Sequence, residues 1–255
     1  MEKIYANGTR ALAPVDLEIR RGEFLTLLGP SGCGKTTLLN LIAGLIGPSA
    51  GTLSWWGGDF AMTGGPGRRF GFVFQAPTLM PWARVAANVR LPLDLAGVPR
   101  RAAIRDADAA LELVGLSEFA AHFPRELSGG MQMRASIARA LATSPDLLLM
   151  DEPFGALDEF TRQRLDAELA ALWAARGLTV VFVTHSIYEA VFLSTRVAVM
   201  GARPGRVIAD IPIDEPFLRT DAFRVSTAFA RHAQRLSARV AEAGAGAPSR
   251  TAKAR

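Results

Sequence analysis

The chain has 255 residues, of which 49% are hydrophobic and 21% are charged, a balance typical of a soluble globular protein with one large domain. Its longest apolar run, Leu38 to Gly47, is too short to cross a bilayer, and a single cysteine excludes an internal disulfide. The formal net charge is +5, but the arginines are scattered and form no dense stripe, which argues against nucleic-acid binding.

The first clear pattern is an apolar run followed by a glycine-rich loop. Phe24 to Leu28 predicts a buried strand, "GPSGCGKT" follows at Gly29 to Thr36, and a helical pattern of apolar residues comes next. The loop matches G-x-x-x-x-G-K-[ST], in which backbone N–H groups surround a phosphate, the lysine reaches the β- and γ-phosphates and the hydroxyl holds Mg²⁺. We therefore expect a nucleotide site here. Because Cys33 lies inside the loop, we also expect bound ATP to protect its thiol from alkylation.

Further short apolar runs predict other strands of a largely parallel sheet. Several of them end in a polar residue. These runs are "FGFVFQ" at Phe70 to Gln75, "LLLM" at Leu147 to Met150, "VVFVT" at Val180 to Thr184 and "VAVM" at Val197 to Met200.

A carboxylate pair follows one of these strands directly. Asp151 and Glu152 come after Leu147 to Met150, so they lie at the carboxyl edge of the sheet, where open α/β sheets bind ligands. Asp151 is placed to support Mg²⁺, and Glu152 is placed to orient or deprotonate a water. His185 follows another strand and is expected at the same edge.

Between Val85 and Thr143 the pattern changes to helices, with breaks expected at Pro92, Pro99 and Pro124. This segment contains "LSGGMQMR" at Leu127 to Arg134. A serine and two glycines at the start of a helix form a second anion site, because the serine caps the helix and the glycines leave backbone N–H groups accessible.

The C-terminal region divides into a helix and a tail. Apolar residues recur at helical spacing over 221–241, which predicts an amphipathic helix that packs on the core. Residues 242–255 are small, polar and basic, and we expect them to be disordered.

Together these motifs resemble the ATP-binding subunit of an ABC transporter. Six elements occur in the order of that family: "GPSGCGKT" (Walker A), Gln75 (Q-loop), "LSGGMQ" (signature), "LLLMDE" (Walker B), "GALD" (D-loop) and His185 (switch histidine). The forms "LMPWARVAANV", "MDEPFGALDEFTR" and "GMQMR" are most similar to the nitrate, sulfonate and taurine importer ATPases.

The resemblance implies a single ABC ATPase domain over residues 1–241. Its fold is expected to be α/β, with a P-loop NTPase (RecA-like) core built on a parallel sheet. An antiparallel β subdomain near the N-terminus and a helical subdomain inserted at about 86–144 complete it.

The resemblance also implies roles for individual residues. Glu152 is expected to be the general base, with His185 and Gln75 beside it; Thr36, Gln75 and Asp151 are expected around Mg²⁺; and Asp158 is expected at the dimer interface. Tyr5 is expected to stack on adenine. The other expected contacts to ATP are Gly29, Pro30, Ser31, Gly32, Cys33, Gly34, Lys35, Thr36 and Thr37, and those to the partner's ATP are Ser128, Gly129, Gly130 and Gln132.

The expected function is ATP hydrolysis that energises a bacterial importer of nitrate, sulfonate, taurine or a related small solute. Two copies would form a head-to-tail dimer with each ATP between the Walker A of one copy and the signature of the other. Separate transmembrane permease subunits, and through them a periplasmic or lipoprotein solute-binding protein, would be the other partners. The chain would thus lie at the cytoplasmic face of the cell membrane.

Two other functions are weaker alternatives. A soluble ABC ATPase acting on nucleic acid or ribosomes would carry either long coiled coils between Walker A and signature or two cassettes in one chain. Here only about ninety residues separate Thr36 from Ser128, and one set of motifs is present. A GTPase or small-molecule kinase has no use for a signature helix, and no NKxD-type guanine motif occurs.

Overall fold

The computed structural model describes residues 1–56, 58–59, 69–216 and 219–245. Its strands are β1 (Lys3–Ile4), β2 (Arg10–Leu12), β3 (Phe24–Leu28), β4 (Ser54–Trp55), β5 (Gly58–Asp59), β6 (Phe70–Val73), β7 (Leu147–Asp151), β8 (Thr179–Thr184), β9 (Arg196–Gly201) and β10 (Arg206–Pro212). Its α-helices are α1 (Lys35–Ile42), α2 (Val85–Leu95), α3 (Arg100–Leu113), α4 (Gly129–Leu141), α5 (Glu159–Arg176), α6 (Ile187–Leu193), α7 (Asp221–Arg224) and α8 (Thr227–Ala245). Two short 3₁₀ turns, Ser117–Phe119 and Pro124–Glu126, lie between α3 and α4.

The main sheet has six strands in the order β10-β9-β3-β8-β7-β6. All neighbours are parallel except β9 and β10, which pair as an antiparallel hairpin. The two N-terminal pairs, β1 with β2 and β4 with β5, are small antiparallel sheets. The expected α/β core with an antiparallel β subdomain is therefore confirmed.

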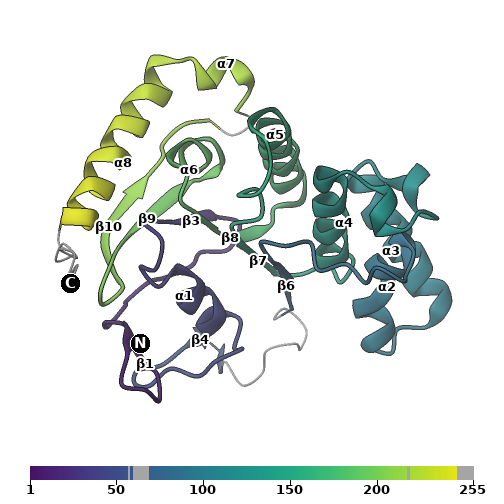
Figure 1. Ribbon diagram of the computed structural model, residues 1–255, viewed down its shortest axis with the longest axis horizontal. Helices are drawn as coiled ribbons and strands as arrows, with labels where there is room; N and C mark the ends of the chain where they lie inside the picture. Colours follow the sequence, from purple (N-terminus) through teal and green to yellow (C-terminus); the bar gives the residue numbers. More distant parts are fainter. Residues whose placement is uncertain (57, 60–68, 217–218, 246–255) are drawn as a thin grey trace, which may run out of the picture.

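The central strands are hydrophobic throughout because both faces of the sheet are covered. Along β7, Leu148 and Met150 belong to one core, whereas Leu147 and Leu149 belong to the other. The helix α1 covers one face, and α5, α6 and α8 lie on the other (Figure 1). Continuous apolar runs rather than alternating ones are the pattern of such doubly covered strands.

The helices α2, α3 and α4 form a group beside the β6 edge of the sheet, apart from the other helices (Figure 1). The predicted break at Pro92 is wrong, because α2 continues through Pro92 to Leu95. Pro92 cannot donate to the Asn88 carbonyl one turn back, but its own carbonyl still accepts from Ala96 N–H over 3.1 Å, so the helix continues past it. Pro99 and Pro124 do lie outside α-helices, as the N-cap of α3 and the first residue of a 3₁₀ turn.

The C-terminal segment contains two helices where the sequence predicts one over 221–241. The break falls at Val225 and Ser226, because the Ser226 hydroxyl accepts a hydrogen bond from Phe229 N–H over 3.1 Å and caps α8. α8 then reaches Ala245, beyond the expected end. The rest of the tail predicted to be disordered, from residue 246 onward, lies outside the described residues.

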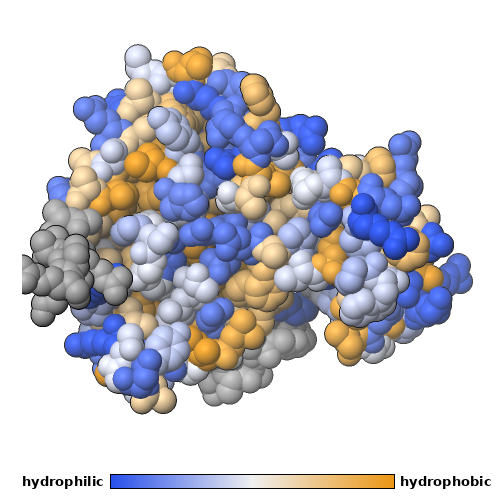
Figure 2. Space-filling view, in the orientation of Figure 1, coloured by the Kyte–Doolittle hydropathy of each residue, from blue (hydrophilic) through white to orange (hydrophobic). Residues whose placement is uncertain are grey.

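No helix in the described part of the chain has both the length and the hydropathy needed to span a bilayer. On the face seen in Figure 2, hydrophobic residues occur in small groups between hydrophilic ones.

Candidate functional site

The glycine-rich loop connects β3 to α1 at the carboxyl edge of the sheet. Gly32 and Gly34 have φ angles of +75° and +94°, which other residues adopt only with strain. Lys35 begins α1, and its side chain is 5% exposed. Its ammonium donates to the Gly29 carbonyl at 2.8 Å and the Pro30 carbonyl at 3.2 Å. The loop therefore encloses a buried positive charge next to accessible backbone N–H groups, which is the arrangement that binds phosphate.

Two carboxylates at the end of β7 face this loop. The Thr36 hydroxyl donates to Asp151 Oδ1 over 3.2 Å, and Lys35 Nζ lies 3.5 Å from Glu152 Oε1. Burial raises the pKa of Asp151, and the hydrogen bond from Thr36 partly opposes this rise. A hydroxyl and a carboxylate oxygen side by side fit Mg²⁺, which prefers oxygen ligands and few carboxylates. Within the described residues, no group of three or more His, Cys, Asp or Glu side chains forms an all-protein metal site.

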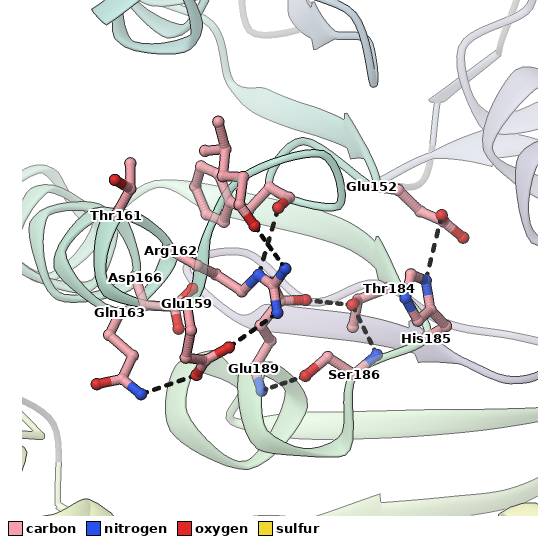
Figure 3. A network of polar contacts seen from close by, with 12 residues as sticks. Glu152, Glu159, Thr161, Arg162, Gln163, Asp166, Thr184, His185, Ser186 and Glu189 are labelled. Carbon is pink, nitrogen blue, oxygen red and sulfur yellow. Dashed lines mark hydrogen bonds and ion pairs between the residues drawn. The ribbon is translucent and has the colours of Figure 1, made fainter. Parts of the chain in front are cut away.

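His185 extends the cluster from the end of β8. Its Nδ1 lies 3.3 Å from Glu152 Oε2, and Figure 3 marks this contact with a dashed line. Glu152 itself has a φ of +46°, an uncommon angle for a residue with a side chain and one often found at functional sites. Gln75, two residues past the end of β6, borders the same cavity as Lys35 and Glu152. The structure thus brings the residues expected to be catalytic into one group.

A cavity of about 620 Å³ extends along the loop and is large enough for a nucleotide. It is lined by Thr9, Arg10, Ala11, Ser31, Gly32, Gly34, Lys35, Thr36, Thr37, Gln75, Asp151, Glu152, Arg203, Pro204 and Gly205.

Sequence reasoning missed two flanks of this cavity, residues 9–11 and 203–205. The β9–β10 loop packs so tightly against the glycine-rich loop that a Cβ on Gly205 would lie 2.2 Å from the Cys33 carbonyl. Arg203 is exposed at the rim with a φ of +54°, and its guanidinium has no hydrogen bond or ion pair to any described residue. The sequence "RPG" at residues 203–205 indicates a turn, but it does not indicate that this turn packs against the glycine-rich loop.

Tyr5 and Cys33 lie near the loop but outside the cavity lining. The half-exposed ring of Tyr5 places its hydroxyl 3.4 Å from Thr37 Oγ1. Cys33 is fully buried, and this burial raises the pKa of its thiol. Its side chain belongs to the core behind the loop, and this burial argues against the ATP-protected alkylation expected from the sequence.

The second anion site lies apart from the first. Ser128 caps α4 by accepting from Met131 N–H over 3.3 Å, and both Ser128 and Gly129 are exposed. They are absent from the lining of the cavity. The Gln132 amide instead donates to the Pro124 and Leu127 carbonyls at 3.1 and 3.2 Å, so it holds the turn before α4.

Asp158, expected at a dimer interface, is beside this second site. It caps α5 by accepting from Thr161 N–H over 3.0 Å. A Cβ on Gly130 would lie 2.8 Å from the methyl group of Thr161, so only glycine allows α4 to approach α5 this closely. The two N-termini therefore form one exposed surface.

Comparison with known protein families gives a match over residues 12–155 to the model described as ABC transporter. The chain is 50% identical over 210 residues to the taurine import ATP-binding protein TauB of Rhizobium johnstonii, covering 82% of this chain and 79% of that protein. It is 45% identical over 223 residues to the aliphatic sulfonates import ATP-binding protein SsuB of Bacillus licheniformis, covering 86% and 85% of the two chains.

Solved structures are also similar. The dimeric bacterial ABC transporter cassette MJ0796 is 35% identical, covers 84% of this chain and 97% of its own, and superposes with a TM-score of 0.72. A post-hydrolysis state of the same cassette, also dimeric and bound to ADP and phosphate, is 34% identical with a TM-score of 0.69 and the same coverage.

Proposed function

Because this chain belongs to the ABC transporter family, we propose that it is the ATP-hydrolysing subunit of an importer and that each ATP binds between two copies of it. The observation that carries the proposal is the separation of the two anion sites. Lys35 and Glu152 lie at the cavity, whereas Ser128 lies on a different, exposed surface. Two phosphate sites that do not share a cavity in one chain can share one ATP across a dimer, and a similar cassette is dimeric.

The glycine-rich loop would hold the phosphates. Lys35 would contact the β- and γ-phosphates from inside the loop, and Thr36, Asp151 and Gln75 would surround a magnesium ion. A magnesium ion held there would supply positive charge to offset the negative charge that develops during phosphoryl transfer. The nucleoside would extend along the opposite flank of the cavity, close to Tyr5 beside Thr37, where Arg203 has no hydrogen bond or ion pair to any described residue.

Hydrolysis requires a base that takes a proton from the attacking water. Glu152 would take this role, and its position between Lys35 Nζ at 3.5 Å and His185 Nδ1 at 3.3 Å supports it. His185 would then contact the γ-phosphate and keep the Glu152 carboxylate in place. Ser128, Gly129 and Gly130 of the second copy would close the site over the same phosphate, with Asp158 beside them.

The transported solute would be a small sulfonate. The relatives named for taurine and for aliphatic sulfonates are 50% and 45% identical to this chain. Nitrate is the other solute expected from the sequence motifs. Separate permease subunits would hold the chain at the cytoplasmic face of the membrane, and a solute-binding protein would deliver the solute. Reconstituted with its permease, the complex should hydrolyse ATP faster with binding protein plus taurine or an alkanesulfonate than with nitrate. Equal stimulation by all three would argue against a sulfonate.

The activity is tested by changing Glu152 to Gln. We expect hydrolysis to fall about 10²- to 10⁴-fold, as the loss of a general base typically causes, while the Kd for ATP stays within about threefold. Phosphate release and calorimetric titration measure the two quantities. Glu118→Gln, on an exposed turn in the helical group, is the matched control and should hydrolyse ATP at the wild-type rate. If Glu152→Gln kept the wild-type rate, the carboxylate would not be the base.

A further inference from the structure

Two loops carry the groups expected to act on ATP. One connects β7 to α5 and includes Glu152 and Asp158; the other connects β8 to α6 and includes His185. The loops touch at the active site through the contact between Glu152 and His185 at 3.3 Å. That contact is exposed on the histidine side, where the side chain is 57% accessible, so it is weakly constrained by itself.

Arg162, on the first turn of α5, holds the first loop together. Its Nε and Nη2 donate to the Phe154 and Leu157 carbonyls at 3.3 and 2.8 Å, and its Nη1 donates to Glu159 at 3.0 Å. The guanidinium therefore uses its fixed fork of donors to bind the backbone between Glu152 and Asp158.

Glu189, on the first turn of α6, holds the second loop in the same way. Its carboxylate accepts from the Thr184 hydroxyl, and Ser186 N–H donates back to Thr184 Oγ1 over 2.9 Å. Ser186 caps the helix by accepting from Glu189 N–H over 3.3 Å. The two sequence neighbours of His185, Thr184 and Ser186, are thus both hydrogen-bonded to Glu189, one to its carboxylate and one to its backbone N–H.

The two anchors meet in an ion pair. Arg162 Nε lies 3.6 Å from Glu189 Oε1, and the side chains are 25% and 6% exposed. Figure 3 shows this pair between the loop of Glu152 and the loop of His185, with the Glu152–His185 contact at the other end of the network. The two loops are therefore joined at two points, by the Glu152–His185 contact and by the Arg162–Glu189 pair, and the main chain of each loop connects one point to the other.

We propose that Arg162 and Glu189 are a positioning pair that fixes Glu152 and His185 relative to each other and ties both to Asp158 at the expected dimer surface. The inference rests on the proposed ATPase function. A water-activating carboxylate tolerates little displacement, because an error of about 1 Å in a reacting group can reduce a rate about 100-fold. Neither Arg162 nor Glu189 borders the nucleotide cavity, so their loss should reduce turnover and leave nucleotide affinity unchanged.

The experiment compares Arg162→Lys, which keeps the charge and loses the fork, with Glu189→Gln, which keeps the shape and the acceptor for Thr184. Arg164→Lys is the matched control, since Arg164 is on the same helix with 60% of its side chain exposed. We expect kcat of the full-length protein to fall about 10- to 100-fold in Arg162→Lys and less in Glu189→Gln, with the Kd for ATP within about twofold of wild type. The control should match wild type in both.

A double-mutant cycle with His185→Ala separates positioning from general stability. If Arg162 acts through the Glu152–His185 geometry, Arg162→Lys should cost much less in the His185→Ala background than in wild type. Equal costs in both backgrounds, parallel loss of ATP affinity and kcat, or loss of folding in Glu189→Gln would each overturn the proposal. Absence of hydrolysis in wild type would instead overturn the ATPase function itself.

Discussion

Lys35 shows how one residue type is matched to its position. Its ammonium is nearly buried, and two carbonyl oxygens and Glu152 surround it. A compact ammonium fits inside a turn of six residues, whereas a planar guanidinium needs an extended set of acceptors. This difference accounts for a lysine in a chain whose other basic residues, Lys3 and Lys253 apart, are all arginines.

Arg203 provides a test of the nucleoside flank. Because its guanidinium is unpartnered among the described residues and lines the cavity, we expect it to contact the nucleotide. Arg203→Ala should weaken binding of ATP and ADP equally, by about 3- to 10-fold for an exposed charge-assisted contact. Arg206→Ala, on the same hairpin but outside the lining, should have the wild-type Kd in calorimetric titration. A loss confined to ATP would place the guanidinium at the γ-phosphate instead.

The thiol of Cys33 should react slowly in the folded protein and quickly once the protein unfolds. Its side chain is fully buried and burial raises its thiol pKa, so little reactive thiolate is available at neutral pH. We expect maleimide to label native protein at least about 100-fold more slowly than protein in guanidinium chloride, with or without Mg-ATP. Mass spectrometry of timed samples measures both rates. Fast labelling that Mg-ATP suppresses would mean that the loop opens in the free protein.

Individual residues were predictable where a local motif carries the chemistry. Lys35, Asp151 and His185 follow strands whose apolar runs are read directly from the sequence. Arg203 and the orientation of Cys33 were not, because each depends on a loop from a distant part of the chain that packs behind the glycine-rich loop. No motif indicates the role of Arg162, because its side chain binds backbone carbonyls, which are present whatever the side chains of the loop are.

At the scale of elements, the strands show what the sequence predicts and what it does not. The strands β3, β7 and β8 were predicted to within one residue, because buried parallel strands have continuous apolar runs. The hairpin strand β10 and the short strands β1, β2, β4 and β5 were not located, because they have few residues or are partly exposed. Register and tertiary neighbours, rather than composition, determine such strands.

The contact between α5 and α7 depends on a buried carboxyl group. Asp166 is 1% exposed and accepts from Arg224 over 3.1 Å, and burial raises its pKa from 3.8 to about 8. A carboxyl with a higher pKa in the folded state binds a proton on folding, so it favours folding at low pH. This contribution is lost as pH rises from about 4 to about 8.

Asp166→Asn should remove that dependence. Between pH 5 and 8 the free energy of unfolding of the variant should gain on wild type by up to about 1.4 kcal/mol per pH unit. Urea unfolding at several pH values measures this difference. Asp108→Asn, at an exposed position of α3, should follow the wild-type profile. If the profiles of Asp166→Asn and wild type were parallel, Asp166 would be ionised throughout and held so by Arg224.

For the whole molecule, the central question is whether one chain can complete an ATP site. The cavity is lined by the glycine-rich loop and by the residues proposed as base and magnesium ligands, but Ser128 and Gly129 are absent from its lining. Among the described residues, the Ser128 hydroxyl is hydrogen-bonded only to Met131 N–H, as a helix cap. Its exposed position next to Asp158 leaves a surface that a second copy can use, and this is the arrangement we propose for a dimer.

Mixing two defective chains tests this arrangement. Lys35→Ala removes the ammonium group proposed to contact the phosphates, and Ser128→Arg blocks the surface proposed to contact the partner's ATP. In a mixed dimer one composite site combines Lys35 of the Ser128→Arg chain with Ser128 of the Lys35→Ala chain, whereas neither homodimer has an intact site. We therefore expect mixed dimers, isolated through two different tags, to retain about one ATP, because each half-site alone lacks ligands for the γ-phosphate.

ATP retention in a Glu152→Gln background is the readout, because binding needs one complete site even if turnover needs two. The control pairs Ser128→Arg with the double variant Lys35→Ala/Ser128→Arg, which should trap no ATP because every composite site then has a defect. If the Ser128→Arg chain alone trapped ATP as well as its parent, the N-terminus of α4 would be only a capped helix. If each ATP site were built from one chain alone, every site would contain the substitution of its own chain, in the mixed dimer as in the parents. Trapping by the mixed dimer and by neither parent would therefore require a site shared between two chains.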